Sequence, residues 1–208
     1  MKKKILLLRE NPPETYLKAL SAVGAEADCS FFVSDYSPYR ALLLIGGGDV
    51  FAPRYGEPAG EERGLNLIRD EREFAALDYF TSRRLPVLGV CRGLQILTVY
   101  FGGTLKTLGG DGVPLHRAEN GKDVCHSVRR PLSLCSVRQV NSNHRQAADR
   151  LPDDARVLLQ AEDGRAECVF FPAANALGVQ FHPERMTEKD AAAWYGFLLG
   201  GPIPLSCV

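Results

Sequence analysis

One cysteine stands where a strand is predicted to turn sharply into a helix. The apolar run 86–90 is typical of a buried parallel strand, and a helix-favouring stretch, 94–100, follows it almost at once. Gly89 and Gly93 lie two residues before and two after Cys91, which is the spacing of a nucleophile elbow with Cys in place of Ser. Glycine suits both positions because a side chain would clash inside the turn. The pattern predicts a cysteine nucleophile at Cys91.

The predicted elbow also favours the reactive form of this thiol. It holds the sulfur at the carboxyl end of the sheet and at the N-terminus of the next helix, where the dipole and the free N–H groups favour thiolate over thiol. A cysteine in apolar sequence is usually a buried small hydrophobe. The two flanking glycines are what argue against that interpretation here.

A thiol nucleophile needs a base and a third group that orients the base. His182 closes an apolar predicted strand and is followed by Pro183 and Glu184. In extended backbone, residues i and i+2 point to the same side, so Glu184 can accept from one ring nitrogen while the other faces Cys91. The two sites should meet because doubly wound sheets place their chemistry at the carboxyl ends of strands. Taken alone, the triplet 182–184 is more simply an ordinary turn.

The remaining histidines give weaker signals. His144 lies in a polar cluster, 141–146, directly after another predicted strand, whereas His116 and His126 lie in turn-rich sequence without a carboxylate at a useful spacing. Cys125 precedes His126, but a metal site needs more ligands at suitable spacing. The sequence therefore predicts no metal site.

Composition limits the class of protein. The 208 residues are 45% hydrophobic, which is enough for one substantial core and predicts a single domain over 1–208. Lys plus Arg (25) equals Asp plus Glu (25), so no net field favours nucleic acid or an anionic membrane. The apolar run 5–8 is too short for a signal peptide, and no stretch approaches the ~20 residues of a membrane span. We expect the six cysteines (29, 91, 125, 135, 168 and 207) to be reduced and the protein to be cytoplasmic.

The order of predicted elements indicates an α/β fold. In the first half, strands alternate with helices, which favours a mostly parallel central sheet with helices on both faces, a three-layer arrangement. The expected strands are 5–8, 27–33, 39–45 and 86–90, and the expected helices are 14–23, 66–84 and 94–100. After residue 104 short strands predict a small antiparallel region, and a terminal helix follows. These elements are expected at 124–128, 133–140, 155–161, 167–171 and 176–181, with the helix at 187–199.

Two loops of the first half bear on the site. Gly46, Gly47 and Gly48 follow a strand and can turn their N–H groups toward a ligand, although such a run can also be only a tight turn. The stretch 53–65 is rich in Pro, Gly and charge and predicts an exposed loop. Glu57 in that loop and Asp70 beyond it are by default solvated charges.

Assembled, these residues resemble the class I glutamine amidotransferase-like superfamily, whose fold is flavodoxin-like. Within it, the gamma-glutamyl hydrolase branch (peptidase C26), which includes gamma-glutamyl-GABA hydrolases, is the most similar. The stretches that carry the resemblance are 44–50, 55–57, 69–70, 86–95, 102–105, 140–146 and 178–184. Arg92, directly after the cysteine, favours the hydrolase branch.

The resemblance implies a role for each matched residue. Cys91, His182 and Glu184 would form a catalytic triad, with an oxyanion hole made by backbone N–H groups of Arg92 and of the Gly47-Gly48 loop. The substrate pocket would comprise Gln95, Asn143, His144, Arg145 and Gln146, with Tyr55 and Glu57. No metal or organic cofactor is implied.

The chain departs from the family pattern in two respects. Members usually show two adjacent histidines where this chain has His144 and Arg145, so Arg145 is expected to alter the pocket or to contact a substrate carboxylate. The chain is also shorter than typical members before residue 42 and around Tyr55, where leaving-group recognition is expected to change.

Three functions are compatible with the sequence. The first is a hydrolase of gamma-glutamyl amide bonds, acting on a small gamma-glutamyl substrate. The second is a glutaminase subunit that passes ammonia to a synthase partner, and the third is a non-catalytic binding or thiol-sensing protein on the same fold. Neither a nucleic-acid nor a membrane partner is expected. The leaving-group amine and the oligomeric state, a homodimer included, are left open.

Overall fold

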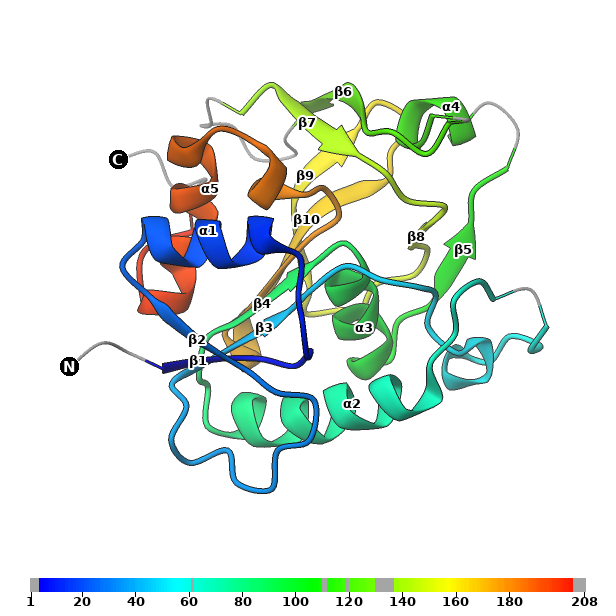
Figure 1. Cartoon of the computed structure of the whole chain (residues 1–208). Coiled ribbons are helices and arrows are strands. Elements are labelled where there is room, and N and C mark those ends of the chain that lie inside the picture. The colour runs from blue at the N-terminus through cyan, green and yellow to red at the C-terminus, as the bar shows by residue number, and fades with distance from the viewer. Residues whose placement is uncertain (1–3, 61, 110–111, 119, 130–136, 204–208) are drawn as a thin grey trace.

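The computed structural model describes residues 4–60, 62–109, 112–118, 120–129 and 137–203 (Figure 1). Its centre is a nine-stranded sheet in the order β2-β1-β3-β4-β11-β10-β9-β6-β7. The first five of these strands run parallel to one another. They are β1 (Lys4–Leu7), β2 (Glu26–Cys29), β3 (Ala41–Leu44), β4 (Val87–Val90) and β11 (Ala176–Val179).

The other half of the sheet is antiparallel. It continues from β11 through strands that pair successively with one another. These strands are β10 (Ala166–Phe171), β9 (Arg156–Ala161), β6 (Val124–Arg129) and β7 (Gln139–Ser142). A separate two-stranded ribbon joins β5 (Leu105–Thr107) to β8 (Gln146–Ala148). This part of the chain carries the polar cluster 141–146 toward the end of the parallel half.

Helices cover both faces of the sheet, as Figure 1 shows. On one face, buried residues of α1 (Glu14–Ala22) and α5 (Glu188–Tyr195) share a core with the sheet. On the other face, α2 (Leu67–Ser82) and α3 (Arg92–Tyr100) do the same. The remaining helical turns are α4 (Gly112–His116), η1 (Ala52–Tyr55), η2 (Pro172–Ala174), η3 (Pro183–Arg185) and η4 (Gly196–Leu199). Among the described residues, no helix is long and apolar enough to cross a membrane.

The α/β fold is confirmed, and the structure differs from the sequence expectation in several elements. The ribbon β5–β8 and helix α4 were not expected. The strand expected at 133–140 lies partly outside the described residues, and β7 occupies 139–142 because Asn141 and Ser142 pair with β6. The expected helix 187–199 is α5 followed by a tighter turn, η4, that begins at Gly196. Cys29, Cys91 and Cys125 are free thiols and Cys168 is buried in β10, whereas Cys135 and Cys207 lie outside the described residues.

The elbow glycines are required by backbone packing. A Cβ on Gly89 would lie 2.5 Å from the carbonyl carbon and oxygen of Gly93. A Cβ on Gly93 would lie 2.4 Å from the carbonyl oxygen of Leu44. Strands β3 and β4 and the first turn of α3 therefore meet at backbone contact, which leaves no room for a side chain.

We predict that Gly93→Ala destabilises the protein although alanine has the higher helix propensity. The added Cβ must displace the backbone of β3, and overpacking of this kind costs about 1–3 kcal/mol. Urea unfolding of this variant is compared with that of Gly109→Ala, where nothing lies within 4 Å of the added Cβ. Equal unfolding midpoints for the two variants would contradict this packing argument.

Candidate active site

Cys91 occupies a strained backbone position between β4 and α3. Its φ of 53° and ψ of −103° lie outside the regions favoured by residues with a side chain. Strain of this kind persists only where the surroundings enforce it, and it is concentrated at functional sites. Here the Cys91 N–H donates to the Val179 carbonyl oxygen at 2.7 Å, which fastens the elbow to the end of β11.

His182 follows β11 and is held in place by two side chains. Its Nδ1 lies 2.8 Å from Oε1 of Glu184. The amide of Asn141 in β7 accepts from the His182 N–H and donates to the His182 carbonyl, both at 2.9 Å. The expectation of extended backbone between His182 and Glu184 is wrong, because residues 183–185 form the 3₁₀ turn η3. The turn nevertheless brings the carboxylate to the ring.

Cys91 and His182 are in contact across the ends of neighbouring strands. Strand β4 pairs with β11 in parallel, with Val90 opposite Val179, so both side chains emerge at the same edge. Burial alone would lower the pKa of His182, but the charge and hydrogen bond of Cys91, together with Glu184, raise it to about 10. His182 is therefore held as an imidazolium at neutral pH, beside the Cys91 sulfur.

We predict that the His182 imidazole titrates near pH 10 in an NMR titration and that Cys91→Ser or Glu184→Gln lowers its pKa. Because folding raises the His182 pKa above its ordinary value of 6.5, the protonated ring stabilises the fold, and this contribution is fully present below pH 6.5. The contribution is then lost as pH rises through about 10. A His182 pKa of 6.5 or lower in the unsubstituted protein would contradict this account of its surroundings.

Two sets of backbone N–H groups adjoin the cysteine. The N–H of Arg92 is in the first turn of α3, where no intrahelical acceptor exists. The loop 46–48 lies on the other side, and Gly46 is so close that a Cβ there would be 3.2 Å from Cε1 of His182. The Gly46 N–H itself donates to the Tyr16 hydroxyl at 3.1 Å, which leaves Gly47 and Gly48 as the candidate donors of this loop.

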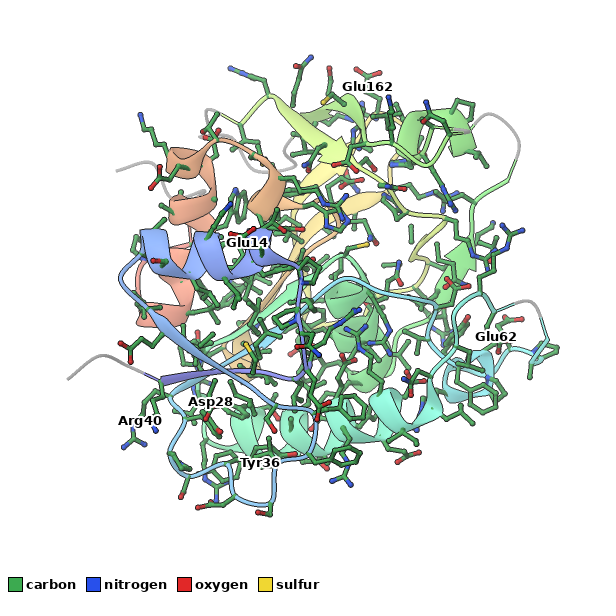
Figure 2. The ribbon with its side chains drawn as sticks, in the orientation of Figure 1. Glu14, Asp28, Tyr36, Arg40, Glu62 and Glu162 are labelled. Atoms are coloured by element: carbon green, nitrogen blue, oxygen red, sulfur yellow. The ribbon has the colours of Figure 1, made fainter. Side chains whose placement is uncertain are left out.

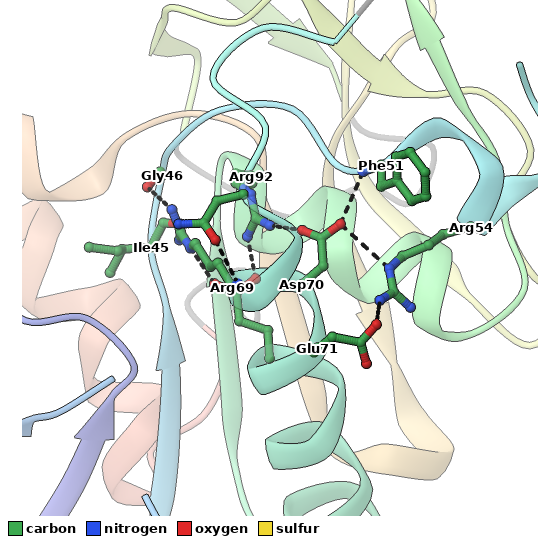
Figure 3. Close-up of polar contacts among 10 residues, drawn as sticks. Ile45, Gly46, Phe51, Arg54, Arg69, Asp70, Glu71 and Arg92 are labelled. Carbon is green, nitrogen blue, oxygen red and sulfur yellow. Dashed lines mark hydrogen bonds and ion pairs between the residues drawn. The ribbon is translucent and has the colours of Figure 1, made fainter. Parts of the chain in front are cut away.

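A buried network of four charges lies behind these N–H groups (Figure 3). The Arg92 guanidinium forms ion pairs with Asp70 and Glu73 of α2. Glu73 also accepts from Nε of Arg69 at 2.7 Å. All four side chains are buried, so the expectation that Asp70 is a solvated charge is wrong. Arg92 reaches α2 because its side chain leaves the elbow away from the catalytic pocket.

The same network fastens the glycine loop. Arg69 donates to the carbonyl oxygens of Ile45 at 2.7 Å and Gly46 at 3.1 Å (Figure 3). A Cβ on Gly47 would lie 2.1 Å from Nη1 of Arg69, so a side chain there would displace the guanidinium that holds the loop. One arginine of the network therefore holds the loop and the other belongs to the elbow.

We predict that Glu73→Gln costs about 3–5 kcal/mol of unfolding free energy, because it leaves buried guanidinium charge uncompensated. Burial raises the pKa of Glu73, but Arg69 and Arg92 outweigh it and hold that pKa below the ordinary range. The matched control is Glu71→Gln in the same helix, whose side chain is 71% exposed and pairs with Arg54. It should change stability by less than about 1 kcal/mol in urea unfolding. A Glu73→Gln effect no larger than that of the control would contradict the assignment.

Cys91 and His182 open into a pocket of about 410 Å³. The loop 46–48, Gln95 and residues 143–146 also line it. Its wall contains one carboxylate, Asp49, and five arginines. The arginines are Arg9, Arg63, Arg117, Arg145 and Arg185. Asp49 pairs with Arg145, and Arg185 pairs with Asp123. The pocket is therefore cationic overall.

The structure separates the predicted substrate-binding residues. Gln95 is at the pocket and donates to the Gln146 carbonyl oxygen at 2.8 Å. Arg145 is committed to Asp49, with Nε at 2.9 Å from Oδ2, and the Asn143 amide donates to the Gly121 carbonyl oxygen at 2.8 Å. Tyr55 and Glu57 line a neighbouring cavity of about 550 Å³ that shares Gln146 with the first.

The His144 ring is turned away from the catalytic pocket. Its side chain is 1% exposed, and its Nε2 faces Glu167 of β10. His116 and His126 face the same carboxylate, which lies too far along the chain to show as a neighbour in the sequence. Glu167 was not singled out in the sequence because it comes from a strand far along the chain.

Several positioning residues were also missed in the sequence. Asn141, Arg69 and Glu73 act through backbone or charge contacts whose partners lie in distant segments. Tyr16 of α1 bonds the Gly46 N–H, and burial, with Glu184 nearby, raises the pKa of its hydroxyl well above the usual value. The signals available were the polar cluster that contains Asn141 and the matched stretch 69–70 that contains Arg69.

Known proteins resemble the chain in sequence and in fold. The Peptidase C26 family model matches residues 37–184. A Schizosaccharomyces pombe protein, "Putative glutamine amidotransferase PB2B2.05", is 32% identical over 72% of this chain, which spans 63% of that relative's length. The gamma-glutamyl-gamma-aminobutyrate hydrolase of Escherichia coli O157:H7 is 34% identical over 86% of this chain and 80% of its own. A glutamine amidotransferase structure from Thermotoga maritima, at 18% identity, matches with a TM-score of 0.61 over 88% of this chain and 77% of that one, which shows the fold alone.

The fold and the sequence relatives identify a glutamine amidotransferase-like protein. This class contains both hydrolases and amidotransferases. The chain belongs to the peptidase C26 family.

Proposed function

We propose that this protein is a cysteine hydrolase that cleaves gamma-glutamyl amide bonds through a glutamyl thioester. The observation that carries the proposal is the contact of a strained elbow cysteine with a histidine that Glu184 orients, both at a pocket wall. The named activity of the Escherichia coli relative supports the substrate class. The peptidase C26 membership supports hydrolysis or amide transfer as the reaction.

The first half-reaction forms the thioester. The Cys91 thiolate attacks the gamma-carbonyl carbon, and the carbonyl oxygen becomes an oxyanion. The N–H groups of Arg92 and of the loop 47–48 stabilise it, and such a donor is worth about 3–4 kcal/mol elsewhere. His182, as imidazolium, gives its proton to the departing amine as the carbon–nitrogen bond breaks.

The second half-reaction releases glutamate. His182 is now neutral and takes a proton from a water molecule, whose oxygen attacks the thioester carbon. The carbon–sulfur bond then breaks, which restores the Cys91 thiolate and leaves the imidazole protonated. Glu184 keeps Nδ1 in place and stabilises the cation in both halves of the cycle.

The charge of the pocket favours an acidic substrate. A glutamyl group carries an alpha-carboxylate, and the arginines of the wall can pair with carboxylates through paired N–H donors. We propose that the amine on the far side of the scissile bond carries a carboxylate as well. An uncharged amine would leave part of this cationic wall without a partner.

A second candidate function is ammonia supply to a separate synthase. The name of the Schizosaccharomyces pombe relative favours it, because glutamine amidotransferases use the same acyl chemistry. The two functions differ in dependence on a partner. A hydrolase turns over gamma-glutamyl compounds alone, whereas a glutaminase subunit is nearly idle until its partner docks.

We predict that the isolated protein hydrolyses gamma-glutamyl amides and that Cys91→Ala lowers turnover by roughly 10⁴-fold or more. The assay is glutamate release from a panel in which the amine carries, or lacks, a carboxylate. Cys125→Ala, which removes an exposed thiol, is the matched control and should retain activity. Circular dichroism checks that both variants are folded.

The outcomes separate the candidates. Carboxylate-bearing amines should be cleaved with the higher kcat/KM. Glutamine hydrolysis only after a synthase is added would favour the second function. Full activity of a folded Cys91→Ala variant would remove Cys91 from the nucleophile role and contradict both.

A further inference from the structure

We propose that His116, His144 and Glu167 form a binding site for a divalent transition-metal ion, separate from the catalytic residues. They come from α4, from the connection between β7 and β8, and from β10. One ligand atom of each lies within 4.8 Å of the others. The side chains of all three are at most 1% exposed. The proposal does not rest on the proposed function.

The distances suit ligands around an ion better than direct hydrogen bonds. Oε1 of Glu167 is 3.5 Å from Nδ1 of His116 and 3.7 Å from Nε2 of His144. A charge-assisted hydrogen bond would bring such atoms to about 2.7–2.9 Å. Neighbouring ligands of a tetrahedral zinc ion, bound at about 2.0–2.1 Å, are about 3.4 Å apart. Small side-chain shifts would therefore place the three atoms on one ion.

The outer ring nitrogens set the tautomers for metal binding. Nδ1 of His144 lies 2.9 Å from the Gln146 carbonyl oxygen, and Nε2 of His116 lies 3.1 Å from Oδ2 of Asp163. Both partners are acceptors, so the outer nitrogen of each ring carries the hydrogen. The inner nitrogens then present lone pairs, the second-shell pattern of metal-binding histidines.

Of the inner atoms, only Nδ1 of His116 has a hydrogen-bond partner in the described part of the chain, the Ser142 hydroxyl at 3.5 Å. Among the described residues, neither carboxylate oxygen of Glu167 nor Nε2 of His144 has a hydrogen-bond partner. Two lone pairs and a carboxylate that face one another in a buried site repel. Burying a carboxylate charge is costly, and a bound cation would offset that cost beyond what the His126 ring supplies at 3.4 Å.

His126 completes the surroundings of the carboxylate. Its Nε2 is 3.4 Å from Oε1 of Glu167, and its Nδ1 is 3.1 Å from the Ser127 carbonyl oxygen. It lies outside the three-atom group, so we assign it to orienting Glu167. Cys125 takes no part, because alternation along β6 places it on the exposed face.

Two imidazoles and one carboxylate are donors that suit zinc and its neighbours rather than magnesium or calcium. The ion would join α4, β10 and the start of the loop 143–146. That loop continues to Arg145 and Gln146 at the catalytic pocket. The site would therefore stiffen one wall of the pocket without touching the reacting atoms.

The test uses the full chain as a Cys91→Ser variant, which removes the catalytic thiol as a competing ligand. Chelator-treated protein is titrated with Zn²⁺ against a chromophoric chelator, and Co²⁺ spectra report the coordination. We expect one ion per chain. Binding should weaken more than about 100-fold when Glu167→Gln or His144→Gln is added, since outer partners alone cost about 10–100-fold.

Substitution of a buried ligand can unfold the protein, so two variants nearer the surface provide a second test of metal affinity. Asp163 is only an outer partner and its side chain is 25% exposed, so Asp163→Asn should fold and weaken binding about 10–100-fold. Its neighbour Glu162, exposed at the turn after β9 (Figure 2), provides Glu162→Gln as a matched control with unchanged affinity. Absence of stoichiometric binding in the Cys91→Ser protein, or unchanged affinity in folded Glu167→Gln and Asp163→Asn variants, would overturn the proposal.

Discussion

The positions of the elbow and of the glycine loop depend on a buried group of alternating charges. Arg92 is the residue after Cys91, and its guanidinium pairs with Asp70 and Glu73 of α2. Arg69, on the same helix, holds the carbonyl groups at 45 and 46. One helix thus positions both the elbow and the glycine loop. Buried charges are costly to leave unpaired. The elbow and the glycine loop therefore cannot move apart without breaking these buried ion pairs.

The antiparallel half of the sheet performs the complementary task for His182. The side-chain amide of Asn141 in β7 hydrogen-bonds both the N–H and the carbonyl oxygen of His182. Just beyond it, the connection to β8 carries Arg145 and Gln146 to the pocket and turns the His144 ring toward Glu167. Cys91 and His182 therefore both emerge from the parallel half, at the ends of β4 and β11. The antiparallel half fixes the His182 backbone and supplies one wall of the pocket. Within the parallel half, the Cys91 N–H donates to the Val179 carbonyl oxygen and joins the elbow to the end of β11.

The sequence predicted those features that are local along the chain. The glycine spacing around Cys91 identified the elbow. The apolar runs of β3, β4 and β11 identified the strand ends and the histidine that follows β11. Features that depend on distant partners were missed. Asp70 looked like a surface charge because Arg92 is 22 residues away. His116 of α4 looked isolated because Glu167 comes from β10, far along the chain. The turn at 183–185 was predicted as extended, since proline is compatible with both conformations.

The central claim is that Cys91 carries the acyl group during turnover. The most direct test is to mix the protein with a gamma-glutamyl amide, quench in acid and map the peptides by mass spectrometry. The account predicts a glutamyl adduct on the peptide that contains Cys91, and predicts its loss in the Cys91→Ala variant. Turnover with the adduct on another residue, or glutamate release that persists in that variant, would contradict it.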